Sequence, residues 1–292
     1  MKCAIIDIGS NTVRLGIVHM DPASDGVRFS CPEGKELRTV RLGEGLLETG
    51  KLQEASMERA VTAIGKFYEK ARSLHLPAFA YATSAVRDAA NRKTFLSRLQ
   101  DKYPVPVEIL DGETEGRLAY LGAGNTGTLL DIGGGSAQIV TAEGSVSQPT
   151  GCVRAKDLCP QGTPEKIYQT LLPWLEERWA SFPAVSAPCF GVGGTITTLG
   201  ALLAGQSVFD GKCLAPITLE ALTNAMDVLY FLLQKGTAPQ LLGQRRDVIL
   251  QGGCILRFFM EKLSFPQILP IDRDGLEGYA AYLYAHGRLT QK

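Results

Sequence analysis

One short phrase occurs twice in this chain, and it constrains the fold more than any other feature. Ile6-Asp7-Ile8-Gly9 returns as Leu130-Asp131-Ile132-Gly133, an offset of 124 positions counted from residue 7 to residue 131. Each copy ends an apolar run, and a polar turn and a second apolar run follow it. Two apolar runs around a short glycine turn are typical of a β-hairpin. We therefore interpret the two segments as matching hairpins that arose by internal duplication.

Strands and helices alternate after each hairpin. Apolar residues at helical spacing predict a helix over residues 53–74, and strands are predicted at 78–82 and 105–110, each followed by a helix. The second half repeats this order, with a helix predicted at about 164–180 and a strand at 188–192. Such alternation indicates an α/β fold with parallel strand pairing.

The length of 292 residues suits two ordinary domains. We predict a first domain over residues 1–125 and a second over 126–275. A C-terminal helix at about 276–292 is expected to pack back on the first domain. In this arrangement the two Asp-x-Gly turns would point into a cleft between the domains.

Composition narrows the function classes. Lys+Arg and Asp+Glu are equal at 30 each, so the chain has no net positive charge that would attract nucleic acid. We therefore expect no nucleic-acid partner. The seven cysteines contain no CxxC pair, and we expect reduced thiols in a cytoplasmic protein. The start of the chain lacks the pattern of a signal peptide. Residues 190–209 carry no charge but are rich in glycine, so no membrane partner is expected.

The polar turns have the composition of phosphate-binding loops. Glycines bring bare backbone N–H groups close to an oxyanion, and hydroxyl and amide side chains add further donors. A third turn of this kind precedes a predicted helix, whose N-terminus favours anions. The candidate phosphate-binding residues of the three turns are Gly9, Ser10, Asn11, Gly133, Gly134, Gly135, Ser136, Gly193, Gly194 and Thr195.

Aspartates inside such turns would repel phosphate unless a cation lies between them. Asp7 and Asp131 therefore indicate Mg²⁺ or a similar hard ion, held by few carboxylates together with water and phosphate oxygens. The alternative is that each aspartate only braces its own turn through backbone N–H groups. Two matched turns and a third glycine turn favour the phosphate site.

Two further segments follow predicted strands and could serve the same site. "YATSAVRDA" places Arg87 near the start of a helix, where its simplest role is an ion pair with Asp88 or a neighbour. "DGETEGRL" places Glu113 and Glu115 in a first helical turn, where acids ordinarily complement the helix dipole. A carboxylate beside bound phosphate could instead accept a proton from an attacking water.

These segments together resemble a known family. "DIGSNTVRL", "ATSAVRDAAN", "VEILDGETEGRLAYLGA", "LLDIGGGSAQIV", "GVGGTITTLGAL" and "RRDVILQGGCIL" are similar, in this order, to motifs of the exopolyphosphatase/guanosine pentaphosphate phosphohydrolase (Ppx/GppA) family. The resemblance implies two ribonuclease-H-like domains of the actin and sugar-kinase superfamily. It also implies Mg²⁺-dependent hydrolysis of the terminal phosphate of inorganic polyphosphate or of the 5′-γ-phosphate of guanosine pentaphosphate, with Mn²⁺ as an alternative cation.

The resemblance also implies roles for individual residues. Glu115 matches the catalytic base and Arg87 the arginine that grips the phosphate, while Asp7 and Asp131 match the aspartates of the two phosphate and metal loops. Arg14 occupies a position that lies near the substrate in some members. Members of the family are commonly dimers, so a homodimer is expected.

The chain departs from the family pattern at Gln138. The second loop of the family usually ends in Ser-Thr-Glu, and that glutamate helps to hold the metal or the water. Here the loop reads Ser136-Ala137-Gln138. Glutamine keeps a carbonyl acceptor without the charge, so we expect weaker metal binding at this position. The length corresponds to a short two-domain form of the family, for which low processivity on long polyphosphate is expected.

Three other functions stay open at this point. An ATP-dependent small-molecule kinase of the same superfamily would use the same turns. A sensor that binds guanosine tetra- or pentaphosphate without efficient turnover is favoured by Gln138 alone. A polyphosphate kinase-like reaction has a precedent among short relatives. The sequence does not separate polyphosphate from guanosine pentaphosphate as the main substrate.

Overall fold

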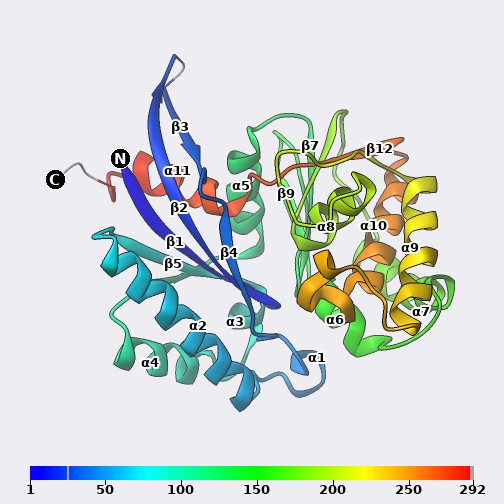
Figure 1. Ribbon diagram of the computed structural model, residues 1–292, viewed down its shortest axis with the longest axis horizontal. Helices are drawn as coiled ribbons and strands as arrows, with labels where there is room; N and C mark the ends of the chain where they lie inside the picture. Colours follow the sequence, from blue (N-terminus) through cyan, green and yellow to red (C-terminus); the bar gives the residue numbers. More distant parts are fainter. Residues whose placement is uncertain (25, 290–292) are drawn as a thin grey trace. The chain divides into compact units, whose positions relative to one another are not determined.

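The computed structural model describes residues 1–24 and 26–289. The chain divides into two compact units (Figure 1). Unit 1 consists of Met1–Gly124 and the C-terminal stretch that begins at Arg273, and unit 2 consists of Asn125–Asp272. Within the described residues each unit contains one six-stranded sheet. Unit 1 is therefore discontinuous in sequence, and unit 2 is continuous.

The sheet of unit 1 has the strand order β3-β2-β1-β5-β6, and a short strand β4 also pairs with β2. β1 and β2 form the predicted antiparallel hairpin, whereas β1, β5 and β6 are parallel. The strands are β1 (Lys2–Ile8), β2 (Thr12–Ala23), β3 (Gly26–Ser30), β4 (Lys35–Thr39), β5 (Ala78–Ala82) and β6 (Val107–Ile109). The helices are α1 (Leu46–Thr49), α2 (Glu54–Ser73), α3 (Ser84–Asp88), α4 (Arg92–Lys102), α5 (Gly112–Ala123) and α11 (Gly275–Ala285).

Helices cover both faces of this sheet, and the alternation of side chains along β1 decides which residue meets which helix. Ala4 and Ile6 belong to a core with α2 and α4, while Cys3 and Ile5 belong to a core with α5 and α11 (Figure 1). Asp7 has the parity of Cys3 and Ile5. The β1 aspartate is therefore directed to the α5 and α11 side of the sheet.

α5 and α11 cross at two glycines. A Cβ on Gly122 would overlap the carbonyl oxygen of Asp274, and a Cβ on Gly278 would overlap that of Leu118. The two helix backbones approach this closely only because neither position carries a side chain. This contact joins the C-terminal segment of the chain to the helix that carries Glu115.

The sheet of unit 2 has the order β11-β12-β10-β7-β8-β9. β7 and β8 form the second predicted hairpin, and β7, β10 and β12 are parallel. The strands are β7 (Thr128–Ile132), β8 (Ala137–Val140), β9 (Ser145–Gln148), β10 (Cys189–Val192), β11 (Ile217–Thr218) and β12 (Gln267–Pro270). The helices are α6 (Cys152–Leu158), α7 (Pro164–Arg178), α8 (Gly194–Leu203), α9 (Leu219–Gln234), the 3₁₀ helix η1 (Gln240–Asp247) and α10 (Ile249–Leu263).

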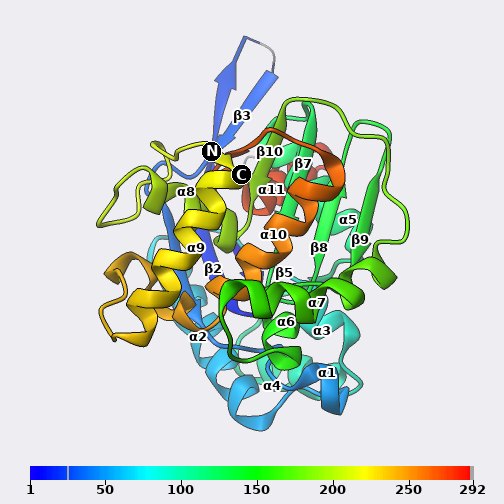
Figure 2. The same ribbon diagram turned by 90° about the vertical axis from the view of Figure 1, so that its right-hand side faces the viewer.

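One large core fills unit 2. Leu130 and Ile132 of β7 belong to one cluster of buried residues with side chains of α7, α9 and α10. Figure 2 shows where β7 and these three helices lie in unit 2. Trp179 and Phe258 each make an edge-to-face ring contact with Phe259 in this core. Both tryptophans of the chain, Trp174 and Trp179, lie in unit 2.

The two units repeat one design. Leaving out β11, the order β9-β8-β7-β10-β12 of unit 2 corresponds to β3-β2-β1-β5-β6 of unit 1. The hairpins also share their register, because Asp7 lies opposite Arg14 and Asp131 lies opposite Gln138. The predicted α/β class with two domains is confirmed. The duplication makes Arg14 and Gln138 equivalent positions, separated by the same 124 residues as the two aspartates.

Candidate active site

The first Asp-x-Gly turn connects β1 to β2 and is held by backbone contacts on both sides. The N–H of Gly9 donates to the Thr12 carbonyl at 3.2 Å, and the N–H of Gly43 donates to the Ser10 carbonyl at 2.8 Å. The Ser10 hydroxyl accepts the N–H of Ala85, at the start of α3, at 3.1 Å. Asn11 is buried, and its carbonyl accepts two further N–H groups from the loop after β4. The turn carbonyls are thus engaged by the protein.

Arg14 does not extend into solvent from this turn. Its Nε and Nη2 donate to Asp7 Oδ2 at 2.8 and 2.6 Å, and its Nη1 donates to Asp274 Oδ2 at 2.5 Å. The Nζ atom of Lys35 lies 3.2 Å from Asp274 Oδ2 and 3.2 Å from Glu277 Oε2. A continuous chain of buried ion pairs therefore runs from Asp7 to Glu277 inside unit 1. The guanidinium predicted to lie near substrate is bound to two carboxylates in this structure.

The two carboxylates that share Arg14 differ in their electrostatics. Burial would raise the pKa of Asp274, but the charges of Arg14 and Lys35 outweigh it and hold that pKa well below its usual value of 3.8. Burial also raises the pKa of Asp7, and there the opposing attraction of Arg14 does not fully compensate. Asp274 has the stronger support because Lys35 and the backbone N–H of Leu276 also contact it. Asp274 is therefore the better-stabilised anion of the pair.

The second Asp-x-Gly turn, between β7 and β8, has the same backbone hydrogen bond as the first. The N–H of Gly133 donates to the Ser136 carbonyl at 3.0 Å. The carbonyls of Gly133 and Gly134 accept the N–H groups of Cys152 and Val153 at the start of α6, at 3.0 and 2.8 Å. Because α6 takes up these carbonyls, the turn presents its N–H groups as the remaining backbone donors. That is the arrangement expected of an anion-binding turn.

Gln138 is fully buried at the end of this turn. Its Nε2 donates to the hydroxyls of Ser136 and Ser147 at 3.0 and 3.2 Å. Its Oε1 is buried and has no hydrogen-bond partner among the residues that the structure describes. A buried acceptor without a donor is costly, so this oxygen suits a water or a cation.

The third glycine turn packs against the second within unit 2. Gly193 has φ of +87°, and a Cβ there would lie 2.6 Å from the Ile132 carbonyl oxygen and 2.8 Å from Asp131 Oδ1. A Cβ on Gly194 would overlap the guanidinium of Arg245, a residue that the sequence reasoning did not select. The only signal for Arg245 is its place in "RRDV", which resembles a family motif.

Thr195 faces the interior of unit 2. Its hydroxyl is hydrogen-bonded to the thiol of Cys152, whose pKa burial raises to about 11. A Cβ on Gly252 would overlap the Thr195 side chain, so α8 and α10 are in close contact here. Thr195 therefore contributes a backbone N–H to the third turn, while its hydroxyl is used in packing.

Arg87 and Glu115 meet in unit 1. β5 ends at Ala82 and leads into α3, which carries Arg87, and β6 leads into α5, which carries Glu115. Since β5 and β6 are parallel neighbours, their following helices start at the same edge of the sheet. Arg87 Nη1 lies 3.0 Å from Glu115 Oε2 and 2.9 Å from the Leu110 carbonyl oxygen.

The neighbouring acids of α5 differ from Glu115 in their surroundings. Asp111 caps the helix and accepts the N–H of Thr114 at 2.7 Å, and this hydrogen bond lowers the pKa of Asp111. Glu113 is exposed, whereas the Glu115 side chain is 16% exposed. The ion pair of Arg87 with Asp88, at 3.4 Å, is also present. Of the two acids singled out in the sequence, only Glu115 is placed against Arg87.

Buried side-chain oxygens, and no cluster of acidic side chains, are what the described residues offer a divalent cation. The described residues contain no cluster of three or more His, Cys, Asp or Glu side chains that could hold a metal. Asp7 Oδ1 and Gln138 Oε1, one in each unit, are buried oxygens that lack a hydrogen-bond partner in the described chain. Magnesium is held by few protein oxygens together with phosphate and water, so these turns fit it in donor type.

The repeated strand order and the paired hairpins define a protein with the fold of the actin and sugar-kinase superfamily. The profile of the Ppx/GppA phosphatase family matches residues 31–276, and the chain belongs to that family.

Individual relatives agree with this assignment. The chain is 29% identical to exopolyphosphatase 2 of Mycobacterium tuberculosis, over 97% of this chain and 98% of the relative. The crystal structure of an Aquifex aeolicus Ppx/GppA family member matches with a TM-score of 0.76 and 25% identity, over 99% of both chains. An exopolyphosphatase from Cytophaga hutchinsonii shares the fold, with a TM-score of 0.78, 22% identity and 98% coverage of both chains. In the described part of the chain no helix is both long and apolar enough to span a membrane.

Proposed function

We propose that this protein is an exopolyphosphatase that releases the terminal phosphate of inorganic polyphosphate. The observation that carries the proposal is the contact between Arg87 and Glu115, at 3.0 Å, at the edge of a Ppx/GppA fold. The exopolyphosphatase name of relatives that match over nearly the whole chain supports polyphosphate as the substrate class. Guanosine pentaphosphate is a second candidate substrate, since it presents the same terminal phosphoanhydride group.

Glu115 is the proposed base. A carboxylate beside a guanidinium is ionised, which is the form that accepts a proton. Arg87, fixed by the Leu110 carbonyl, holds Glu115 in one orientation. Glu115 orients a water for in-line attack on the terminal phosphorus and takes its proton. The bond between that phosphorus and the bridging oxygen breaks, and phosphate and a shortened chain are released.

The glycine turns have a second role, which is to bind the negatively charged phosphoryl oxygens of the substrate. Each of the turns, at Gly9 in unit 1 and at Gly133 in unit 2, offers backbone N–H groups to phosphoryl oxygens, because phosphoryl transfer depends mostly on positioning and on charge stabilisation. Asp7 in unit 1, and Asp131 and Gln138 in unit 2, are the predicted ligands for Mg²⁺, which would supply positive charge to phosphoryl oxygens when bound. Arg87 adds a fixed positive charge beside the base.

The decisive experiment compares phosphate release from short polyphosphate, long polyphosphate and guanosine pentaphosphate, with and without Mg²⁺. Glu115→Gln is expected to lower turnover by about 10²–10⁴-fold, the usual contribution of a general base, while substrate binding is retained. Glu113→Gln is the matched control, because it removes an exposed acid from the same helical turn. Circular dichroism checks that both variants fold.

Each possible outcome of these assays supports or removes one of the alternative functions. Full turnover of Glu115→Gln would remove the base assignment, and absence of phosphate release from every substrate would remove the hydrolase. Tight binding of guanosine tetra- or pentaphosphate without turnover would favour the sensor, for which the neutral Gln138 is the one supporting feature. Formation of ADP from ATP with a sugar would favour the kinase, and nucleotide-dependent polymer growth would favour the polyphosphate kinase-like reaction.

A further inference from the structure

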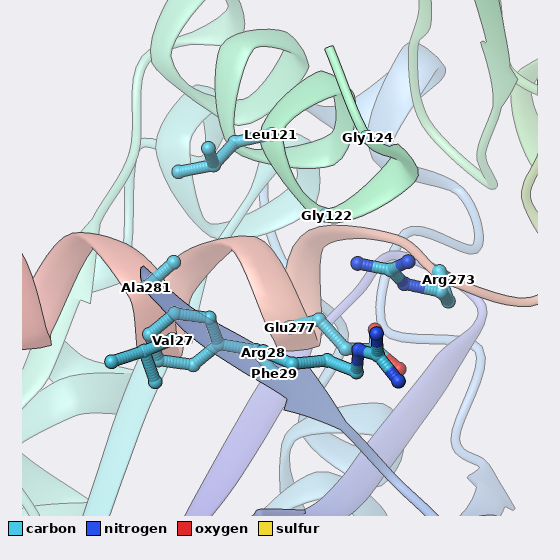
Figure 3. Close-up of a pocket in the computed structure, with 9 residues that line it drawn as sticks. All are labelled: Val27, Arg28, Phe29, Leu121, Gly122, Gly124, Arg273, Glu277 and Ala281. Carbon is cyan, nitrogen blue, oxygen red and sulfur yellow. The ribbon is translucent and has the colours of Figure 1, made fainter. Parts of the chain in front are cut away.

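A pocket outside the proposed active site opens on unit 1. It has a volume of about 380 Å³ and lies between β3, the end of α5 and the first turns of α11 (Figure 3). None of the turn residues, Arg87 or Glu115 lines it. Its size lies in the range of small-molecule sites, which is larger than a single inorganic phosphate requires.

The pocket has a polar end and an apolar end. Figure 3 shows the side chains of Arg28 and Arg273 extending toward the end at Glu277, and Val27, Leu121 and Ala281 at the other end. Leu121 is 37% exposed, a large apolar side chain left at the rim. The ring of Phe29 is fixed by an edge contact with Tyr284, at 5.9 Å between ring centroids.

The charges at the polar end are unequal. Glu277 is buried, and its Oε2 already accepts the backbone N–H of Asp274 at 3.0 Å and lies 3.2 Å from Lys35 Nζ. The side chains of Arg28 and Arg273 make no hydrogen bond or ion pair with any residue that the structure describes. The carboxylate of the pocket is therefore compensated from inside the unit, and the two guanidiniums are not.

Two guanidiniums at one end of a partly apolar pocket match a particular class of ligand. Guanidinium forks bind phosphate through paired charge-assisted hydrogen bonds, and two positive charges suit a dianion better than a single carboxylate. The apolar end would be left in water by inorganic phosphate alone. A flat or aliphatic body attached to the phosphate would cover it.

We propose that this pocket binds an organic phosphate monoester. Arg28 and Arg273 hold the phosphate dianion, and the organic body lies against Val27, Leu121 and Ala281. The site is independent of the proposed hydrolytic function, because it shares no residue with it.

Phenyl phosphate is the probe, and calorimetric titration of the full chain is the measurement. The double variant Arg28→Gln/Arg273→Gln is expected to weaken this binding at least tenfold. Ala281→Phe fills the apolar end without changing charge and is expected to weaken it similarly. The matched control is Lys66→Gln/Lys93→Gln, which removes two exposed positive charges from α2 and α4 of the same unit and should bind as the wild type does.

Two further titrations test the class of ligand. Phenol and inorganic phosphate should each bind this pocket at least tenfold more weakly than phenyl phosphate. Binding of phosphate at the catalytic groups is distinguished by the double variant, because this binding remains in Arg28→Gln/Arg273→Gln while binding at the pocket is lost. The proposal is overturned if that variant binds phenyl phosphate like the wild type, if no phenyl phosphate binds, or if inorganic phosphate binds this pocket equally well.

Discussion

At the scale of single residues, Gln138 is the position where the chain departs most clearly from its family. The fully buried Gln138 side chain donates to two hydroxyls, and its Oε1 has no partner among the described residues, so the surroundings already contain one buried acceptor oxygen. Replacing it with glutamate would allow both serine hydroxyls to donate to the new carboxylate. The charge, however, would be costly to bury without a cation.

We expect Gln138→Glu to lower the Mg²⁺ concentration that gives half-maximal phosphate release. We also expect it to lower the melting temperature in the absence of Mg²⁺ and to recover stability when Mg²⁺ is added. Gln148→Glu, in the paired strand β9, is the control and should change neither quantity. An unchanged Mg²⁺ requirement in Gln138→Glu would show that this position does not influence the metal.

Asp274 is a buried carboxylate whose removal should lower the stability of the protein. It joins Arg14 and Lys35, and breaking a buried ion pair by removing one partner costs about 3–5 kcal/mol. Asp7 and Glu277 still contact the two cations, so we expect the lower end of this range for Asp274→Asn. Chemical denaturation followed by circular dichroism at pH 7 measures the loss.

The pH dependence of this loss has a defined sign. The pKa of Asp274 is lowered in the folded protein, so its contribution is complete above the usual value of 3.8 and is lost as the pH falls further. The stability difference between wild type and Asp274→Asn should therefore be constant from pH 6 to 8 and shrink below about pH 4. A difference that grows on acidification would contradict the ion-pair account.

At the scale of helices and strands, much of the fold could be predicted from local pattern. The helix predicted over residues 53–74 is α2, Glu54–Ser73, and both hairpins form at the predicted glycine turns. Apolar periodicity and turn chemistry are local, and they were sufficient there. The edge strands β3 and β4 and the short helix α6 were not predicted, because each lacks a long apolar pattern.

The candidate site was predictable only for residues that follow predicted parallel strands or lie in the family motifs. The ends of parallel strands brought Arg87 and Glu115 to one edge, as their places after two predicted strands and the family motifs indicated. The contact of Arg14 with Asp274 joins residues 260 positions apart. No local pattern shows which of several acids an arginine will meet at that separation. The pocket at Arg28 and Arg273 depends in the same way on non-local packing.

The crossing of α5 and α11 gives a prediction at this scale. Gly278→Ala would place a methyl group on the Leu118 carbonyl and force the helices apart, at a cost of about 1–3 kcal/mol for overpacking. Because both tryptophans lie in unit 2, fluorescence reports on that unit alone. Circular dichroism follows both units. We expect the part of its thermal transition that comes from unit 1 to move to lower temperature, while the transition followed by tryptophan fluorescence does not move.

Gly144→Ala is the control for this experiment, since a Cβ at Gly144 would meet no atom of the described residues within 4 Å. It should leave both transitions in place. If Gly278→Ala melts like the wild type, the helices are not held at the distance described here.

At the scale of the whole molecule, the two units differ in how they close. Unit 2 is one continuous stretch with a core of its own, Asn125–Asp272. Unit 1 needs Leu276, Tyr279 and Leu283 of α11 to cover one face of its sheet. Without α11, that apolar face would be exposed, and Arg14 and Lys35 would lose Asp274.

We therefore expect residues 125–272, expressed alone, to fold cooperatively, whereas residues 1–124 alone should not. Near-ultraviolet circular dichroism and urea titration test the first fragment. Hydrogen exchange of β1 tests the second. Adding a peptide of residues 273–289 to the 1–124 fragment should increase protection of β1. A stable 1–124 fragment without the peptide would show that α11 is dispensable.

The discontinuity of unit 1 has a consequence for the order of events during synthesis. The first 124 residues leave the ribosome before their closing helix has been translated, whereas unit 2 is complete as soon as Asp272 emerges. Domains generally begin to fold as they are made. Unit 1 is therefore synthesised first but completes its fold last. The apolar face of its sheet, which α11 covers in the finished protein, stays exposed to aggregation while unit 2 is translated.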